Sequence, residues 1–212
     1  MGDFGKSGNK EFNYTFLDLL KELDNLNIDL RFRISSIEPN LLSDEIISFI
    51  STSKKFVRHF HIPLQSGSDS ILRLMRRRYD SKLYKSKIEK INKLMPDACI
   101  GVDVIVGFPG ENDDLFLESL NFLDSLNVSY FHVFTYSERD NTHAISLPNV
   151  VESRVRTKRS KLLRLLSSKK KASFHERNKG SIQDVLFESE EKNGYIEGFS
   201  SNYIRFRRPW DP

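Results

Sequence analysis

Four short apolar runs divide the first 150 residues, and each run ends in a polar loop. The runs cover residues 32–37, 59–64, 99–108 and 130–136. Ile, Val and Phe fill them without clean alternation, which is typical of strands buried on both faces, whereas the stretches between them show helical spacing. The pattern predicts repeated strand–loop–helix units built on a parallel sheet.

The helices between these runs have recognisable start signals. Ser43, Asp80 and Asn112 each precede an apolar-periodic stretch, as does the pair Ser68 and Asp69, and a further helix is expected over residues 13–26. Four complete units are too few for a closed eight-fold barrel, which usually needs about 250 residues. We therefore expect an α/β fold with an open, partial barrel over residues 1–150, and a chain that is a piece of something longer.

The polar loops after the strands locate a candidate binding site. In parallel α/β folds ligands bind at the carboxyl ends of the strands, so four loops should converge: residues 36–39, 65–68, 107–111 and 136–139. Burying unpaired polar groups is costly, so the polar side chains placed in or just beyond the apolar runs need partners. These are Glu38, Gln65 and Asp103.

Two chemical interpretations of these polar groups are open. Three hydroxyl-seeking groups around one mouth suit a ribose, and the planar fork of Arg77 suits a carboxylate. Alternatively, the same side chains cap neighbouring helices and pair with one another.

Charge is distributed unevenly along the chain. The net charge is +4, yet residues 151–179 contain eleven Lys or Arg and only two Glu. Such a basic helix favours a polyanion surface. An ordinary solvated helix is equally consistent, with four leucines packed on the barrel: Leu162, Leu163, Leu165 and Leu166.

After Gly180 the pattern changes to short alternating runs with Asn193-Gly194 as a hairpin turn. Residues 180–212 are therefore expected to form a small, incomplete β-module. Its last stretch mixes aromatic and cationic side chains, which suits base stacking and phosphate neutralisation. These residues are Tyr203, Arg205, Phe206, Arg207, Arg208 and Trp210.

Composition narrows the setting. No apolar stretch is long enough to span a membrane and no signal peptide is present, so a cytoplasmic location is expected. The single cysteine, Cys99, lies in an apolar run and is expected to be a buried, inert thiol. One cysteine cannot supply the ligands of an iron–sulfur cluster.

Four segments together resemble the radical S-adenosylmethionine (SAM) methylthiotransferases. They are RFRISSIEP (31–39), HFHIPLQSGSDSILRLMRRRY (59–79), DVIVGFPGE (103–111) and HVFTYSERDNTHA (132–144). The SSIEP, RRRY and HVF-YS-R forms are most similar to the tRNA threonylcarbamoyladenosine methylthiotransferases, which make 2-methylthio-N6-threonylcarbamoyladenosine next to the anticodon. The tail from about Ser173 resembles the start of a TRAM domain, an RNA-binding β-barrel.

The resemblance implies a domain organisation, a partner and a cofactor site. Residues 1–150 would be the carboxyl-terminal part of a radical SAM β/α barrel, 151–179 a basic linking helix and 180–212 the start of a TRAM-like module, with tRNA as partner. SAM would be the cofactor. Its ribose would contact Gln65 and Asp103, and its methionine carboxylate would pair with Arg77. Glu38 and Ser66 would lie beside the same ligand, and its adenine would lie along the backbone of Val104, Ile105, Val106 and Gly107.

The chain departs from this family in one respect. The CxxxCxxC motif is missing, as are three further cysteines, which together hold two [4Fe-4S] clusters in family members. The resemblance therefore implies an inactive fragment of a longer enzyme, with catalytic residues unassigned and no metal ligands of its own. Isopentenyladenosine in tRNA and a ribosomal protein are alternative substrates.

Two functional hypotheses outside this family stay open. His59 and His61 lie two apart on one strand, and with Asp103 and His132 they resemble the metal centre of barrel hydrolases. A non-catalytic RNA-binding protein would use the basic helix and the tail. A separate hypothesis is that residues 1–12 or a neighbouring chain cover the open barrel edge.

Overall fold

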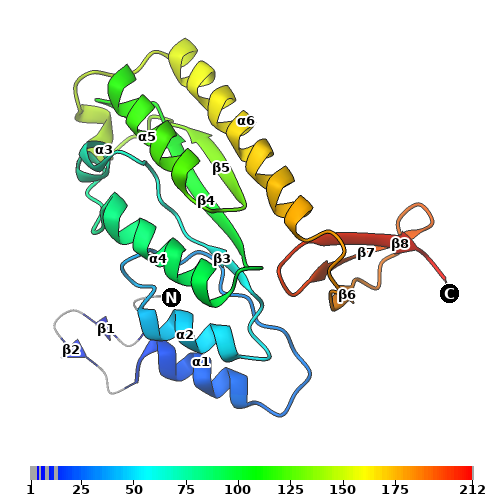
Figure 1. Ribbon diagram of the computed structural model, residues 1–212. Coiled ribbons are helices and arrows are strands. Elements are labelled where there is room, and N and C mark those ends of the chain that lie inside the picture. Colours follow the sequence, from blue (N-terminus) through cyan, green and yellow to red (C-terminus); the bar gives the residue numbers. More distant parts are fainter. Residues whose placement is uncertain (1–3, 5, 8–9, 12–13, 212) are drawn as a thin grey trace.

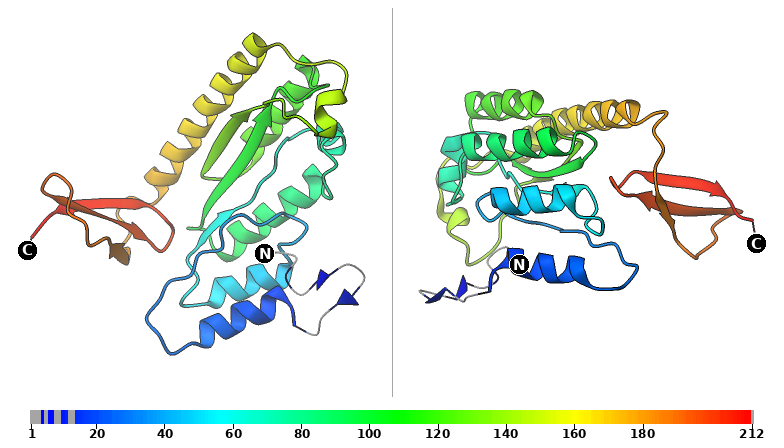
Figure 2. Two further views of the ribbon diagram at one scale, coloured as in Figure 1. Left: turned by 180° about the vertical axis from the view of Figure 1, so that it is seen from behind. Right: turned by 60° about the horizontal axis from the view of Figure 1, so that its bottom comes forward.

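The computed structural model describes residue 4, residues 6–7 and 10–11, and residues 14–211. Its centre is a parallel sheet of β3 (His59–His61), β4 (Cys99–Val106) and β5 (Tyr130–Thr135), in that order. Helices form a layer outside this sheet, and the sheet does not close on itself (Figures 1 and 2). The expected open α/β barrel is thus confirmed.

Six α-helices and one short 3₁₀ helix, η1 (His143–Ser146), accompany the sheets of the described chain. Three of the predicted start signals are confirmed, because the side chains of Ser43, Asp80 and Asn112 each accept a hydrogen bond from the backbone N–H three residues on. The helices are α1 (Phe16–Asn25), α2 (Asp44–Thr52), α3 (Asp69–Leu74), α4 (Ser81–Leu94), α5 (Asp113–Ser125) and α6 (Ser153–Arg177).

Alternation along β4 separates the core from the barrel interior. Val102 and Val104 belong to the hydrophobic core beneath the helices, together with Phe60, Ile62, Ile100, Val106, Phe131 and Val133. Because side chains of neighbouring strand positions point to opposite faces, Asp103 points to the concave face instead. Its register partner on β5 is His132. Polar residues that interrupt the apolar runs, such as Asp103, therefore lie on the interior face of the open barrel.

The first predicted strand is wrong. Residues 32–37 make only two isolated parallel bridges, Phe32 with Phe56 and Ser36 with His61. Only the two ends of this segment pair with the neighbouring chain, through backbone hydrogen bonds of Phe32 and Ile37. The second strand is also shorter than predicted, since Pro63 lacks a ladder N–H. Gln65 nevertheless rejoins the sheet through a bridge to Val104.

The tail forms a separate antiparallel sheet of β6 (Val185–Phe187), β7 (Tyr195–Ser200) and β8 (Arg205–Pro209). Asn193 and Gly194 have φ of 55° and 76° and join Lys192 to Tyr195 in the tight turn that the sequence predicts. This sheet projects from the carboxyl end of α6 (Figure 1).

The loop between β7 and β8 anchors the tail to the barrel. Asn202 is fully buried, and its amide donates to the Asp97 carbonyl at 3.1 Å and to Asn178 Oδ1 at 2.8 Å. The ring of Tyr203 stacks on His59 with 4.4 Å between centroids. Since His59 begins β3, this contact lies at the amino-terminal end of the sheet.

Two remaining features concern the start of the chain and its helices. The short strands β1 (Lys6–Ser7) and β2 (Lys10–Glu11) pair with each other. The hypothesis that residues 1–12 cover the barrel edge involves positions outside the described residues. Among the described helices, none combines the length and the apolar composition that crossing a membrane requires.

Candidate cofactor cavity and its surroundings

A cavity of about 700 Å³ lies at the carboxyl ends of the strands. Its size falls within the range of small-molecule sites in proteins. Three of the four predicted loops contribute to it, through Gln65, Phe108 and Tyr136. The other lining residues are Leu74, Met75, Arg76, Arg77, Asp103, Ile105, Phe134, Thr135, Ser137, Arg139, Thr142, His143 and Ala144.

Gln65 occupies a strained position at the cavity. Its φ is 73°, a left-handed conformation that is uncommon for a residue other than glycine. Two backbone hydrogen bonds hold it there, from its N–H to the Asp103 carbonyl and from the Ile105 N–H to its own carbonyl, both 2.8 Å. Within the described chain its side-chain amide has no partner, so it is available to a ligand.

Arg77 lines the cavity and pairs with Glu38, which does not line it, with 3.0 Å between Nη1 and Oε1. The alternative that the predicted site residues pair with one another is therefore correct for these two. However, the pair uses only one of the five N–H donors of the guanidinium. Arg77 Nε is buried and has no partner among the described residues, as is true of the Tyr136 hydroxyl. Unsatisfied buried groups in a cavity favour a ligand there.

The segment from Val104 to Gly107 is divided by its alternation. The side chain of Ile105 lines the cavity, whereas those of Val104 and Val106 point into the core, so only their backbone faces the site. Ser66, expected beside the cofactor, does not line the cavity. It is fully buried, and its hydroxyl accepts a hydrogen bond from the Ser68 N–H at 3.2 Å.

The amino-terminal half of α6 holds the loops of the cavity in place. Arg159 bonds the carboxylate of Glu111 at 2.7 Å, and Glu111 in turn accepts the Gly107 N–H at 2.7 Å. Arg156 donates to the Tyr136 carbonyl at 2.9 Å and also pairs with Glu138. These positioning roles are not visible in the sequence, where Arg156 and Arg159 look like two more cations of a basic helix.

Burial is the largest influence on the pKa of Glu111, which links this turn to α6. Glu111 is 3% exposed, and burial raises its pKa above the usual range, although the Gly107 N–H and Arg159 act in the opposite direction. A carboxylate in this setting depends on its buried partners. The turn after β4 is therefore tied to α6 by a desolvated ion pair.

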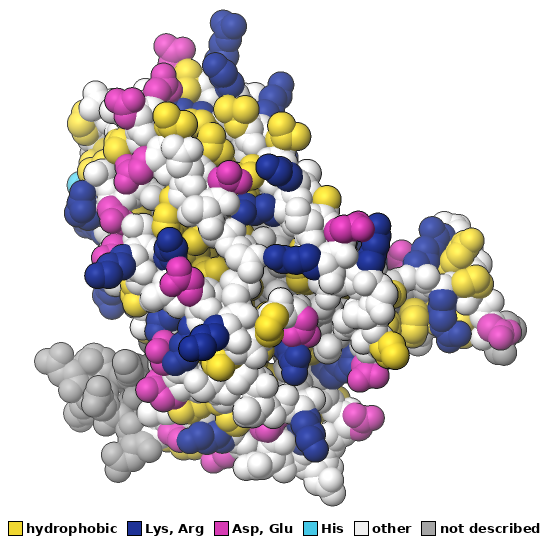
Figure 3. All heavy atoms as spheres, viewed as in Figure 1, with side chains coloured by type: hydrophobic (Ala, Val, Ile, Leu, Met, Phe, Trp, Pro, Cys, Tyr) yellow, Lys and Arg dark blue, Asp and Glu magenta, His cyan; other side chains and the backbone are white. Residues whose placement is uncertain are grey.

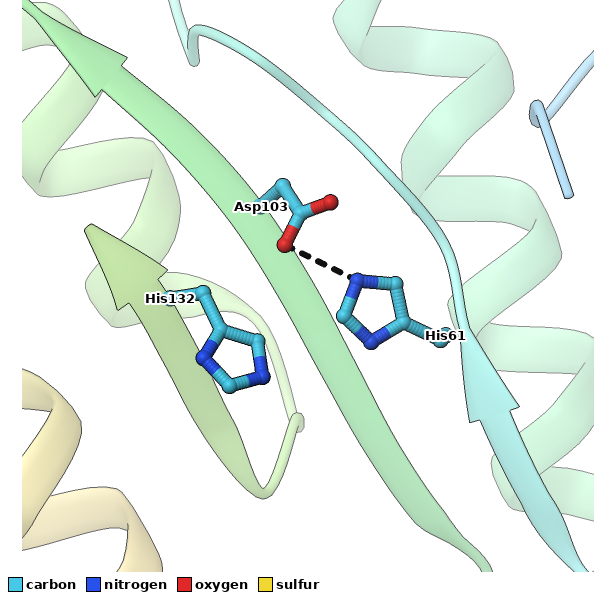
Figure 4. A group of neighbouring side chains, drawn as sticks. All are labelled: His61, Asp103 and His132. Atoms are coloured by element: carbon cyan, nitrogen blue, oxygen red, sulfur yellow. Dashed lines mark ion pairs between the residues drawn. The ribbon is translucent and has the colours of Figure 1, made fainter. Parts of the chain in front are cut away.

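A polar layer lies below the cavity on the concave face. Figure 4 shows His61, Asp103 and His132 pointing toward one another from β3, β4 and β5. His61 Nε2 lies 2.8 Å from Asp103 Oδ1, and the two imidazole rings are 5.3 Å apart. His59 does not join this group, contrary to the metal-centre reading. It is buried one layer lower, with Nε2 3.0 Å from the Tyr130 hydroxyl.

The cations of α6 divide between two faces. Arg164, Lys170 and Arg177 join Arg156 and Arg159 in bonding to the barrel. The outward stripe carries Arg154, Lys158, Lys161, Leu165 and Lys169, with Leu165 71% exposed. Of the four leucines expected on the barrel, only Leu163 and Leu166 pack there. Figure 3 shows Lys and Arg side chains spread over this face and mixed with Asp and Glu, including some at the top, where α6 begins.

The thiol of Cys99 is ill suited to ligate a cluster. It is buried at the start of β4, and burial raises its pKa to about 11. A thiolate is the form that binds iron, so this residue would be protonated and inert at neutral pH. It is also the only cysteine of the chain.

Comparisons with known proteins agree with this geometry. Residues 7–123 match the Radical SAM superfamily. A solved structure of coproporphyrinogen III oxidase (HemN) from Escherichia coli, described as a radical SAM enzyme, superposes with a TM-score of 0.51 at 16% identity, covering 76% of this chain and 35% of that chain. This likeness concerns the fold alone.

Two curated relatives are much closer in sequence. Threonylcarbamoyladenosine tRNA methylthiotransferase MtaB from Bacillus subtilis is 38% identical over 207 residues, covering 95% of this chain and 46% of the relative. A tRNA-2-methylthio-N(6)-dimethylallyladenosine synthase from Vesicomyosocius okutanii is 40% identical over 164 residues, covering 77% and 37%. The chain spans less than half the length of these relatives.

An open β/α barrel with a cavity at the carboxyl ends of its strands defines a class of α/β proteins whose ligand site lies at that edge of the sheet. Within that class, the chain belongs to the radical SAM superfamily. Members use SAM together with an iron–sulfur cluster. The cavity fits SAM, because it offers unsatisfied donors and hydroxyl-seeking side chains. The residues of this chain do not fit a cluster, for which only buried Cys99 is present.

Proposed function

We propose that the chain is part of an enzyme that methylthiolates C2 of N6-threonylcarbamoyladenosine in tRNA, next to the anticodon. Support comes from the relatives named as tRNA methylthiotransferases and from the cofactor-sized cavity. Residues 1–150 would act as part of the catalytic barrel, 151–179 as a linking helix and 180–212 as a TRAM-like module. The proposal places the enzyme in the cytoplasm with its tRNA.

In this proposal the cavity residues bind and orient SAM. The side chains of Gln65 and Asp103 hold the ribose hydroxyls, and Arg77 uses its free donors for the methionine carboxylate while Glu38 fixes its fork. The backbone from Val104 to Gly107 lies along the adenine. Ser66 supports the loop from behind through Ser68. When bound, SAM supplies the radical that removes a substrate hydrogen and the methyl group that accompanies the sulfur.

Charge at the cavity is the observation that favours threonylcarbamoyladenosine over the dimethylallyl substrate. Arg76 and Arg139 both line the cavity, and within the described chain neither forms an ion pair. A threonylcarbamoyl group carries a carboxylate that an arginine fork can bind. A dimethylallyl group is apolar and would form no ion pair with either of these exposed cations.

The proposal assigns the iron–sulfur ligands to parts of the enzyme outside this chain. Cys99 cannot provide them, for the reasons of burial and pKa given above. The isolated chain is therefore expected to be inactive. It would contribute cofactor orientation, substrate selection and tRNA contacts.

Contacts with tRNA would involve α6 and the tail. The outward stripe of α6 presents Arg154, Lys158, Lys161 and Lys169. In the tail, Arg207 lies over the ring of Tyr195, 3.8 Å from its centroid, and Phe206 and Trp210 are exposed. Cations track phosphates and exposed rings stack on bases, so these surfaces suit RNA.

The test uses the full-length enzyme that contains this segment, with its clusters reconstituted anaerobically. Mass spectrometry should find 2-methylthio-N6-threonylcarbamoyladenosine in treated tRNA that already carries the threonylcarbamoyl group. Product on dimethylallyladenosine tRNA or on a ribosomal protein instead would overturn the substrate assignment. RNA binding without any product, from a full-length chain that has no cluster cysteines, would favour a non-catalytic RNA-binding protein.

A matched pair of variants separates substrate selection from cofactor chemistry. Arg76→Gln and Arg139→Gln should each lower product formation about tenfold or more, since a hydrogen bond to a charged group is lost. SAM cleavage to 5′-deoxyadenosine should continue. Arg78→Gln is the control, because Arg78 is exposed like Arg76 and Arg139 but does not line the cavity. Equal effects of Arg76→Gln and Arg78→Gln would contradict the role of the cavity arginines.

A further inference from the structure

The polar layer below the cavity has the composition of a metal site. His61, Asp103 and His132 come from three adjacent parallel strands, and one ligand atom from each lies within 4.8 Å of the other two. Two imidazoles and one carboxylate form the ligand set of many Zn²⁺ and Fe²⁺ centres. The sequence places these residues far apart, and only the strand register brings them together.

The register explains why the three side chains converge. Asp103 and His132 are direct partners across β4 and β5, so both point to the concave face. His61 pairs with Gly101, two residues before Asp103, and therefore reaches Asp103 diagonally. Gly101 makes room for the Tyr130 ring, since a Cβ there would lie 2.4 Å from the Tyr130 hydroxyl.

The ligand atoms are available for coordination. Asp103 Oδ1 lies 2.8 Å from His61 Nε2, and a cation can take the place of the proton that these two atoms share. Within the described chain neither ring nitrogen of His132 has a hydrogen-bond partner.

We propose that His61, Asp103 and His132 bind one divalent transition-metal ion of the Zn²⁺, Fe²⁺ or Co²⁺ class. Three protein ligands leave at least one coordination position open. Asp103 also lines the cavity, so with Oδ1 on the ion its Oδ2 is left for a ligand bound there. The site goes beyond the proposed tRNA modification and does not depend on it, since binding requires only the residues of this chain.

The test titrates the tag-free, metal-stripped chain with Zn²⁺ by isothermal calorimetry. One ion should bind per chain, and Co²⁺ should give the visible d–d bands of a four- or five-coordinate site. Asp103→Asn and His132→Ala should each weaken binding at least tenfold. Loss of a residue that merely hydrogen-bonds a metal ligand already costs about 10- to 100-fold in affinity. Circular dichroism confirms folding, and His132 is exposed enough for its truncation to be tolerated.

His143→Ala is the matched control. His143 lines the same cavity but lies outside the trio, on η1. Its loss should leave the affinity and the Co²⁺ spectrum unchanged. Absence of saturable binding by the folded chain would overturn the proposal. So would binding of one ion that both trio variants leave unchanged, or that His143→Ala abolishes.

Discussion

At the scale of single residues, the candidate site depends on buried charges that must keep their partners. The side chains of Arg159 and Glu111 are 5% and 1% exposed, and 2.7 Å separates them. Replacing a buried pair as a whole is often tolerated, whereas removing one partner leaves an uncompensated charge. The cost of losing Arg159 should therefore exceed the net value of the pair.

Arg159→Met tests this dependence. It should lower the free energy of unfolding by about 3–5 kcal/mol, the usual cost of breaking a buried pair. Denaturant unfolding followed by circular dichroism measures the change. Lys158→Met is the control, because Lys158 is exposed on the same helix and should stay within about 0.5 kcal/mol of the parent chain. The double variant Glu111→Gln with Arg159→Met should recover part of the loss; no recovery would contradict the buried-charge explanation.

His59 should make stability depend on pH. Burial, followed by the positive charge of Arg33 nearby, lowers its pKa to about 3. In the unfolded chain the pKa is about 6.5, so between these values the unfolded state binds a proton that the folded state does not. The stability contributed by neutral His59 is complete above pH 6.5 and should fall by up to about 1.4 kcal/mol per pH unit as the pH drops toward 3.

A comparison with His59→Gln isolates this effect. Glutamine keeps a polar partner for the Tyr130 hydroxyl but cannot be protonated. Burial also lowers the pKa of His132 and His175, so the parent chain has other contributions of the same sign. The difference between the parent and His59→Gln unfolding energies should therefore shrink as the pH falls from 6.5. Parallel curves for the two chains would show that His59 is not held neutral.

At the scale of elements, the turn after β4 has to let α6 approach. Gly107 has a φ of 75°, and a Cβ there would lie 2.3 Å from Arg156 Cγ. Gly180 has nearly the same φ of 77°, but nothing lies within 4 Å of its Cβ position. The two glycines therefore differ in steric contact and not in backbone conformation.

Paired alanine variants measure that contact. Gly180→Ala should cost about 1–2 kcal/mol, the penalty for an L-residue in the left-handed region. Gly107→Ala should cost more, because Arg156 must also move and its bond to the Tyr136 carbonyl is disturbed. Thermal unfolding of both variants gives the comparison. An equal loss for the two would mean that the turn accommodates a side chain without displacing Arg156.

Local signals predicted the elements well where the physics is local. The caps at Ser43, Asp80 and Asn112 each accept a hydrogen bond from the backbone N–H only three residues on, so the sequence alone could predict them. Pairing is not local: residues 32–37 look like a strand in the sequence, yet only Phe32 and Ser36 pair with the neighbouring segment. The sequence also could not show which cations of α6 face the barrel, because Arg156 and Arg159 do not differ in pattern from the exposed Lys158.

The same limit applies to the candidate site. Strand ends predicted that Gln65, Asp103 and Arg77 would meet, and all three line one cavity. Sequence spacing could not show that Arg77 already pairs with Glu38, nor that Ser66 is turned away from the wall. These outcomes depend on side-chain directions that arise only when three strands and α3 pack together.

At the scale of the whole molecule, the buried loop between β7 and β8 links the tail to the barrel, and Arg31 adds a hydrogen bond to the Asp184 carbonyl at 3.2 Å. Asn202 bridges the Asp97 carbonyl before β4 and the Asn178 side chain after α6. Tyr203, beside it, stacks on His59 at 4.4 Å. The position of the tail sheet therefore depends on contacts at the amino-terminal end of the barrel, opposite the cavity.

Asn202→Ala should release the tail without unfolding the barrel. The variant leaves the Asp97 carbonyl and the Asn178 side chain without their partner, at a cost of about 1–3 kcal/mol. Because β6 to β8 form a small sheet of their own, this loss should fall on the docking contact. Limited proteolysis should then cut the connection at residues 178–184 several-fold faster, while cleavage within residues 59–135 stays unchanged. Glu190→Ala, at an exposed position of the tail, is the control. Faster cleavage throughout the barrel would show that the loop stabilises the whole fold and does not merely position the tail.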